Sequence, residues 1–69
     1  MPMSSFVING VEQDLRPGLT VADVVRELML EGKRIAVERN GDIVPRSLHA
    51  QTSIAPGDRV EVVVAVGGG

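Results

Sequence analysis

The 69-residue sequence has no cysteine, tryptophan or tyrosine, and only one histidine and one phenylalanine. Without cysteine the chain forms no disulfide and has no thiolate nucleophile, and one histidine falls short of the four ligands of a structural zinc site. With Phe6 as its only aromatic residue, the chain lacks the stacking platforms that usually hold single-stranded nucleic acid. Its net charge of −2 also opposes binding to phosphates. We therefore expect neither a zinc-binding domain nor a nucleic-acid partner.

Long hydrophobic runs are also missing. The longest apolar run, Val62–Val66, is far shorter than the roughly 20 residues that span a bilayer. The first ten residues lack the basic start and the apolar stretch of about 7–15 residues that mark a signal peptide. These features predict a cytoplasmic protein that has no membrane partner.

The apolar residues that are present, 43% of the chain, are mostly valine, isoleucine and leucine, which favour a core containing a sheet. Apolar and polar residues alternate on both sides of Asn9-Gly10, a dipeptide typical of tight hairpin turns. This pattern predicts two strands, over 5–9 and 11–15. Arg16-Pro17-Gly18 ends the second strand, because proline cannot donate a backbone hydrogen bond.

A helix is predicted to begin at Thr20, whose side chain can cap the first free amides while Asp23 reaches back in a variant of the capping box. The next apolar residues recur at helical spacing and form one stripe: Val21, Val24, Val25 and Leu28. Gly32 is well placed to end the helix in the left-handed conformation. The prediction is therefore a helix of about three turns.

The rest of the chain is again predicted to form mainly strands. A strand near Ile35 and Val37, a second hairpin cue at Asn40-Gly41 and a short extended piece at 43–45 precede one helical turn within 46–53. A tight turn at 55–58 leads into the longest strand, 59–66. We expect one α+β domain, residues 1–66, with a mixed sheet of four to five strands and one main helix across one face. The first and last strands are expected to be its central pair, and residues 67–69 form a flexible glycine tail.

No set of residues indicates an enzyme. A nucleophile, a base and an orienting group would have to come from serine, threonine, one histidine and a few carboxylates. His49 lies in the least patterned segment, and we interpret it as a solvated loop residue rather than a general base. The prediction is a non-enzymatic protein with no metal site and no cofactor of its own.

The three terminal glycines, Gly67, Gly68 and Gly69, do not form a phosphate-binding loop, because no helix follows them. Three residues without side chains extend on the order of 10 Å beyond the last strand and can enter a narrow channel in a partner. There the terminal carboxylate can attack the α-phosphate of ATP and form an acyl-adenylate. An ordinary frayed terminus is the alternative.

A second candidate site is the face of the sheet opposite the helix. If Val60, Val62 and Val64 face the helix, then Val63 and Ala65 face outward beside the tail. The outward residues of neighbouring strands, Val7 and Ala36, would join them. Such an apolar patch often marks a partner site, although single exposed apolar residues are common. We predict that these four residues form a docking face.

Three segments occur in an order that is similar to a known family. Ile35–Arg46 is similar to an A-V-N-x-x-I-V-P-R stretch, Ile54–Glu61 to a turn and final strand, and Val64–Gly69 to a glycine terminus. Together they resemble the ThiS family of sulfur carriers, which have the ubiquitin-like β-grasp fold. The likeness covers essentially the whole chain and is weakest over Met1–Ser5. It departs from the family pattern at Glu38–Gly41, where the asparagine-led part of the motif is not clearly matched.

The resemblance implies a mechanism. A ThiF-like enzyme would adenylate the carboxylate of Gly69 with ATP and Mg²⁺, and sulfur from a cysteine desulfurase persulfide would then give a thiocarboxylate. A ThiG-like synthase would take that sulfur for the thiazole of thiamin, while Gly67 and Gly68 allow the tail to thread into each partner. The alternatives are a MoaD-like subunit of molybdopterin synthase, a carrier for another sulfur pathway, or a plain interaction domain.

Overall fold

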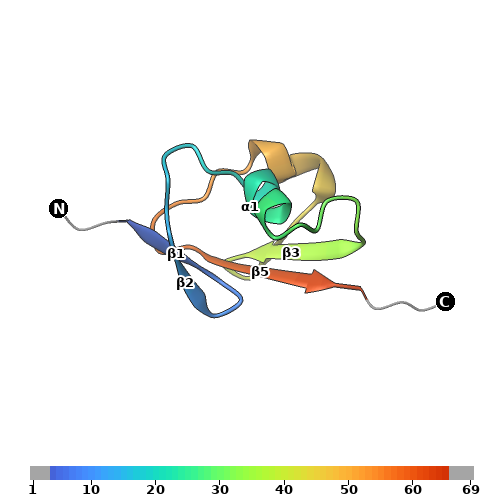
Figure 1. Ribbon diagram of the computed structural model, residues 1–69, viewed down its shortest axis with the longest axis horizontal. Helices are drawn as coiled ribbons and strands as arrows, with labels where there is room; N and C mark the ends of the chain where they lie inside the picture. The colour runs from blue at the N-terminus through green and yellow to red at the C-terminus, as the bar shows by residue number, and fades with distance from the viewer. Residues whose placement is uncertain (1–3, 66–69) are drawn as a thin grey trace.

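The computed structural model describes residues 4–65, and its elements follow the order expected for an α+β domain. The strands and helices are β1 (Ser5–Ile8), β2 (Val11–Asp14), α1 (Val21–Glu27), β3 (Ile35–Arg39), β4 (Asp42–Val44), the 3₁₀ helix η1 (Arg46–Gln51) and β5 (Arg59–Val64). The five strands form one sheet in the order β2-β1-β5-β3-β4. Helix α1 and η1 lie together on one face of this sheet (Figure 1). No helix within residues 4–65 is long and apolar enough to cross a membrane.

Both asparagine-glycine turns close hairpins, as predicted. Asn9 and Gly10 have φ angles of 49° and 84°, and Asn40 and Gly41 have φ angles of 53° and 89°. Two consecutive residues with positive φ make a turn whose twist matches that of the flanking strands. These turns fix β1 against β2 and β3 against β4 in antiparallel pairs.

The predicted capping box starts α1. The backbone N–H of Asp23 donates to Oγ1 of Thr20 at 3.2 Å, and the N–H of Thr20 donates to Oδ2 of Asp23 at 3.0 Å. Two amides that the helix itself cannot pair are thereby satisfied. The sequence therefore placed the start of the helix correctly.

The predicted end of the helix was wrong. Helix α1 stops at Glu27, and Met29, with φ of 60°, takes the left-handed position that the sequence assigned to Gly32. The N–H of Met29 donates to the carbonyl of Arg26 at 2.9 Å, and that of Leu30 donates to the carbonyl of Val25 at 3.0 Å. This pair of bonds is a Schellman motif, and it leaves α1 with about two turns rather than three.

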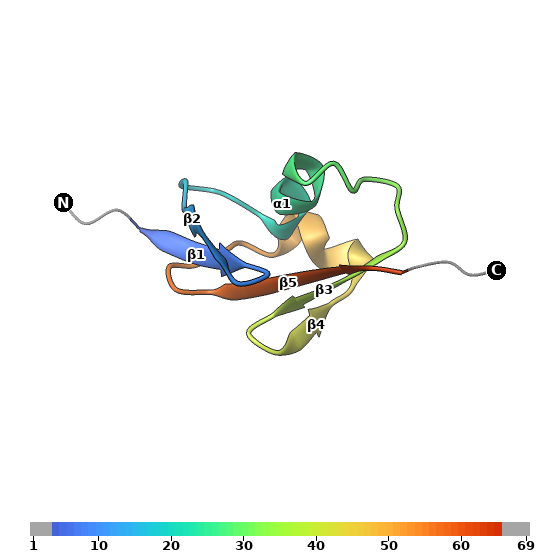
Figure 2. The ribbon, with the colours of Figure 1, turned by 60° about the horizontal axis from the view of Figure 1, so that its bottom comes forward.

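The core lies between the sheet and α1, and β5 is its central strand. Strand β5 runs parallel to β1 and antiparallel to β3, as expected for the central pair (Figure 2). The buried apolar residues come from β1, α1, β3, β4, β5 and two loops: Phe6, Leu19, Val21, Val24, Val25, Val37, Val44, Ile54, Val60 and Val62. Val64 does not join them and is 42% exposed, because it pairs with Ile35 at the last rung between β3 and β5.

His49 is buried, so the interpretation of a solvated loop residue was wrong. Its Nε2 lies 3.1 Å from the carbonyl oxygen of Val44. The segment 46–51 forms η1, which packs against α1 and carries the imidazole inward. His49 therefore joins η1 to the end of β4 and has a structural role.

Candidate functional site

The end of β5 is the base from which the glycine tail starts. The N–H of Ala65 donates to the carbonyl of Arg34 at 2.9 Å and so continues the pairing beyond the last rung of β5. The predicted modified residue, Gly69, and the predicted threading residues, Gly67 and Gly68, lie outside the described residues. The site that the structure describes is therefore the surface around this base.

Three of the four predicted docking residues lie near this base on the face opposite α1. Val63 is 62% exposed and lies directly opposite Ala36 on β3. Ala65, two residues after Val63, is also exposed, and alternation along β5 places it on the same side. The structure thus brings Val63, Ala65 and Ala36 together.

Val7 lies apart from these three residues. It is half-buried and its partner on β5 is Arg59, four residues before Val63, which corresponds to roughly 13 Å along the strand. Sequence reasoning missed Ile43 of β4, which is 69% exposed and lies opposite Glu38. The alternation of Ile43 with buried Val44 was the signal that could have found it.

We call the exposed residues Ala36, Ile43, Val63 and Ala65 the outer patch. Glu38 and Glu61 face each other across β3 and β5, and Glu38 also faces Ile43, so acidic side chains lie beside Ile43 within this surface. An apolar area next to the start of the tail provides contact surface for a protein partner.

Three basic residues lie near the same base. Lys33, Arg34 and Arg46 are exposed, and we call them the basic group. The Nη2 of Arg46 donates to the carbonyl of Lys33 at 2.7 Å, while the carbonyl of Arg34 accepts from Ala65. The chain carries a net charge of −2, so this local positive charge favours an acidic surface on a partner. Sequence reasoning missed the basic group, because Arg46 joins the other two only through the fold.

The best-connected carboxylate of the described residues, Asp58, has a structural role. It is buried and accepts hydrogen bonds from the Nε of Arg39 at 2.7 Å, the N–H of Ala55 at 2.8 Å and the Nδ2 of Asn40 at 2.9 Å. Burial by itself raises the pKa of Asp58, but the bonds from Ala55, Asn40 and Arg39 outweigh it and hold the pKa below its usual value. Asp58 is therefore a carboxylate that fastens two turns together.

Within residues 4–65 no group of three or more histidine, aspartate or glutamate side chains is placed to hold a metal ion. The histidine and the buried aspartate each bond to neighbouring residues of the fold.

The mixed five-stranded sheet, with parallel β1 and β5 at its centre and one helix across one face, defines the ubiquitin-like β-grasp fold. The family model of ThiS matches residues 6–69, and the chain belongs to the ThiS family. Its structure is similar to that of the thiamine biosynthesis protein ThiS from Geobacter metallireducens. The TM-score is 0.76 and the identity 26%, and the match covers 94% of this chain and 99% of the other. The fold and the family expected from the sequence are confirmed.

Two relatives extend the comparison. The chain is 43% identical over 64 residues to a thiazole synthase of Paramagnetospirillum magneticum; the match covers 93% of this chain and only 20% of that protein. It is 34% identical over 65 residues to the uncharacterized protein ycf40 of Porphyra purpurea, covering 94% and 92% of the two chains. A segment similar to this chain thus occurs within a longer protein named thiazole synthase.

Proposed function

We propose that this chain is the sulfur carrier for the thiazole of thiamin. The observation that supports this most directly is the match of the ThiS family to residues 6–69, which includes all three terminal glycines. A free carboxylate is a poor acyl donor, so the carboxylate of Gly69 first attacks the α-phosphate of ATP on a ThiF-like enzyme with Mg²⁺. Pyrophosphate leaves, and the product is an acyl-adenylate.

The sulfur then enters in two steps. The terminal sulfur of a persulfide, formed by a cysteine desulfurase, attacks the acyl carbon of the adenylate and AMP leaves. A thiol cleaves the resulting acyl disulfide, which leaves the thiocarboxylate on Gly69 and a disulfide on the donor. The thiocarboxylate passes its sulfur to a ThiG-like synthase, so every catalytic group belongs to a partner and this chain is the substrate.

The surface around the base of the tail supports this division of labour. The outer patch and the basic group lie where β5 ends, so a partner that binds them receives Gly67 and Gly68 directly into its site. Glycine allows a backbone to approach a nucleotide closely. The thiazole synthase that contains a similar segment supports a ThiG-like partner, because joining two chains raises their effective concentration.

The mass of the intact chain tests the proposal. The purified chain is incubated with a ThiF-like enzyme, ATP, Mg²⁺, a cysteine desulfurase and cysteine. Its intact mass is then measured by mass spectrometry. We expect the mass increase that corresponds to replacing one oxygen by one sulfur, located on the C-terminal peptide. A chain lacking Gly68 and Gly69 is the control and keeps its mass. If the full chain also keeps its mass, it is not a sulfur carrier.

The pathway needs a separate test. The thiocarboxylated chain is offered in turn to a ThiG-like synthase and to the large subunit of molybdopterin synthase. Loss of sulfur to the ThiG-like synthase alone is expected from membership of the ThiS family. Loss to the molybdopterin enzyme alone would support the MoaD-like alternative instead.

A further inference from the structure

Within residues 4–65, strand β2 is an open edge of the sheet, because only β1 pairs with it. The two-residue turn at Asn9-Gly10 makes Ile8 and Val11 a hydrogen-bonded pair, and such pairs alternate along a hairpin. The bond from the N–H of Leu15 to the carbonyl of Ser4, at 2.9 Å, fits this alternation. The backbone groups of Glu12 and Asp14 therefore point away from β1, and within residues 4–65 they have no hydrogen-bond partner.

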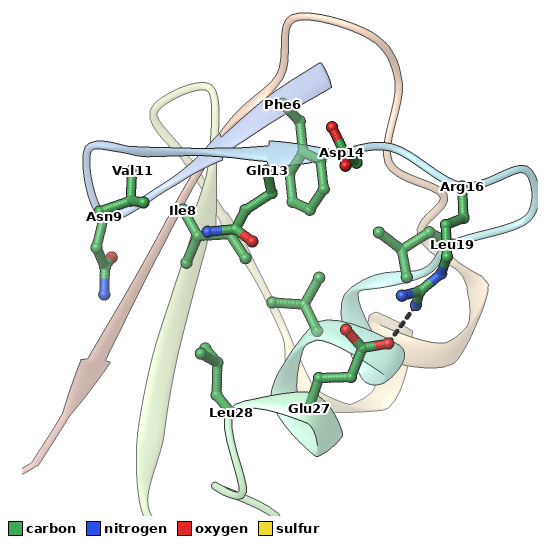
Figure 3. A pocket seen from close by; sticks show the side chains of 11 residues that line it. Phe6, Ile8, Asn9, Val11, Gln13, Asp14, Arg16, Leu19, Glu27 and Leu28 are labelled. Carbon is green, nitrogen blue, oxygen red and sulfur yellow. Dashed lines mark hydrogen bonds and ion pairs between the residues drawn. The ribbon is translucent and has the colours of Figure 1, made fainter. Parts of the chain in front are cut away.

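An apolar groove lies beneath this edge. It has a volume of about 660 Å³ and lies between the β1–β2 hairpin and α1 (Figure 3). Its apolar lining residues are Phe6, Ile8, Val11, Leu19, Val24 and Leu28. The polar ones are Asn9, Gln13, Asp14, Arg16 and Glu27, of which Arg16 and Glu27 form an ion pair. Val11 is 59% and Leu28 38% exposed. The groove stays open because α1 ends at Glu27 and does not cover β2.

The other side of β2 is acidic. Glu12 and Asp14 are exposed. Glu12 lies on the face opposite the groove, since successive side chains of a strand alternate, whereas Asp14 lies at the rim and is one of the lining residues of the groove. Ser5 Oγ donates to Glu12 Oε2 at 2.9 Å, which holds that carboxylate beside the strand. Within the described part of the chain, the edge of β2 thus presents unpaired backbone N–H and C=O groups, with the apolar residues of the groove on one side and exposed carboxylates beside them.

These charges decide what fits the edge. A second copy that paired β2 with β2 would place Glu12 and Asp14 opposite carboxylates of the same kind, and like charges across strands are unfavourable. A strand that carries basic side chains at the same positions would instead form opposite-charge pairs. Its intervening side chains would point into the groove and need to be apolar.

We propose that β2 and the groove beneath it bind an extended segment of a partner protein in which apolar and basic side chains alternate. The segment adds a strand to the sheet, and its backbone pairs with Glu12 and Asp14. Its apolar side chains bury Val11 and Leu28, and its lysines or arginines lie beside the two carboxylates. This site does not include the outer patch of β3, β4 and β5, so a partner can hold the chain here while the tail is engaged elsewhere.

A peptide titration followed by NMR tests this proposal without any sulfur chemistry. The probe is a hexapeptide of alternating valine and lysine with blocked ends, added to the ¹⁵N-labelled full chain. We expect shift changes in β2 and in the groove, and slower hydrogen exchange of the amides of Glu12 and Asp14. A hexapeptide of alternating valine and glutamate is the control and should cause no change.

Charge variants complete the test. The double variant Glu12→Lys and Asp14→Lys should bind the lysine peptide roughly tenfold more weakly, because two attractive pairs become repulsive. The matched variant Glu38→Lys and Glu61→Lys changes the acidic pair of β3 and β5 and should bind as the unmodified chain does. No shift change at about 1 mM peptide, or changes confined to β4 or to the outer patch, would overturn the proposal. Concentration-dependent shifts of β2 without peptide would point to a second copy instead.

Discussion

The side chains of Asn9 and Asn40 connect the tips of the two hairpins to β5. Asn9 donates from Nδ2 to the carbonyl of Val62 at 3.1 Å and accepts at Oδ1 from the N–H of Val62 at 2.8 Å. Asn40 accepts at Oδ1 from the N–H of Arg59 at 2.9 Å and donates from Nδ2 to Asp58. The amide of Asn9 thus takes the place of a strand neighbour beside Val62, and that of Asn40 bonds the first residue of β5 and the carboxylate that precedes it.

Replacing Asn9 separates these two roles. In Asn9→Gly the positive φ stays accessible but both bonds to Val62 are lost, and we expect the free energy of unfolding to fall by roughly 1–3 kcal/mol. The free energy of unfolding of Asn9→Ala should be lower still, because alanine also disfavours the left-handed conformation. Urea denaturation measures both variants. If Asn9→Gly equals the unmodified chain, the bonds to Val62 do not contribute to stability.

Among the polar residues described, Asp58 is the one whose substitution should lower the free energy of unfolding most. Asp58→Ala leaves the guanidinium of Arg39, the amide of Asn40 and the N–H of Ala55 without their acceptor. We expect a loss of about 2–4 kcal/mol in the free energy of unfolding, measured in urea. Asp42→Ala, at an exposed aspartate, is the control and should change stability by less than about 0.5 kcal/mol. Equal effects at both positions would contradict the role given to Asp58.

The lowered pKa of Asp58 also predicts how stability changes in acid. A carboxyl group with a lower pKa in the folded chain adds stability above its unfolded pKa, 3.8, and loses it as the pH falls toward its folded pKa. The free energy of unfolding should therefore decrease below about pH 4–5, and less steeply in Asp58→Asn. Part of the slope should remain, because the backbone bond from Thr20 also lowers the pKa of Asp23. Identical slopes in the two proteins would exclude Asp58 as a source.

At the scale of elements, the end of α1 gives a stabilising prediction. Met29 is exposed and holds a φ of 60° in the Schellman motif. Because glycine adopts this conformation without a Cβ clash, Met29→Gly should raise the free energy of unfolding by roughly 0.5–1 kcal/mol. The melting temperature should rise accordingly. Met29→Val is the opposite control and should lower it, since a β-branched residue is poorly suited to positive φ.

The elements themselves were largely predictable, because each depends on nearby residues. The period of two around Asn9-Gly10 and the capping box at Thr20 gave β1, β2 and the start of α1. The end of α1 was not predictable, since Met29 rather than a glycine takes the left-handed position. The bond of Asn9 to Val62, the burial of His49 and the approach of Arg46 to Lys33 depend on contacts between distant segments. No local pattern reports such contacts.

At the scale of the whole molecule, the two proposed contact surfaces lie on different strands. The outer patch lies on β3, β4 and β5, and the basic group lies near the end of β5, whereas the groove lies at the β2 edge (Figure 3). The core that joins them is small and central, so an exposed substitution at either surface should leave the fold intact. Each surface can therefore be tested by its own variant.

Val63→Asp tests the outer patch as the docking face. Val63 is exposed on the side opposite α1, so its replacement should leave the stability of the chain nearly unchanged. An aspartate there adds charge to the apolar area next to Ala36, and we expect roughly tenfold weaker binding to a ThiG-like synthase. Calorimetric titration of the synthase with the full chain measures the effect.

The control for this variant is Leu48→Asp, which makes a similar change at an exposed apolar residue of η1 on the helix side. It should bind the synthase as tightly as the unmodified chain. Equal weakening by both variants would mean that added negative charge, rather than the outer patch, opposes binding. If Val63→Asp keeps full affinity, the docking face lies elsewhere, and the basic group of Lys33, Arg34 and Arg46 becomes the next surface to test, because it also adjoins the base of the tail.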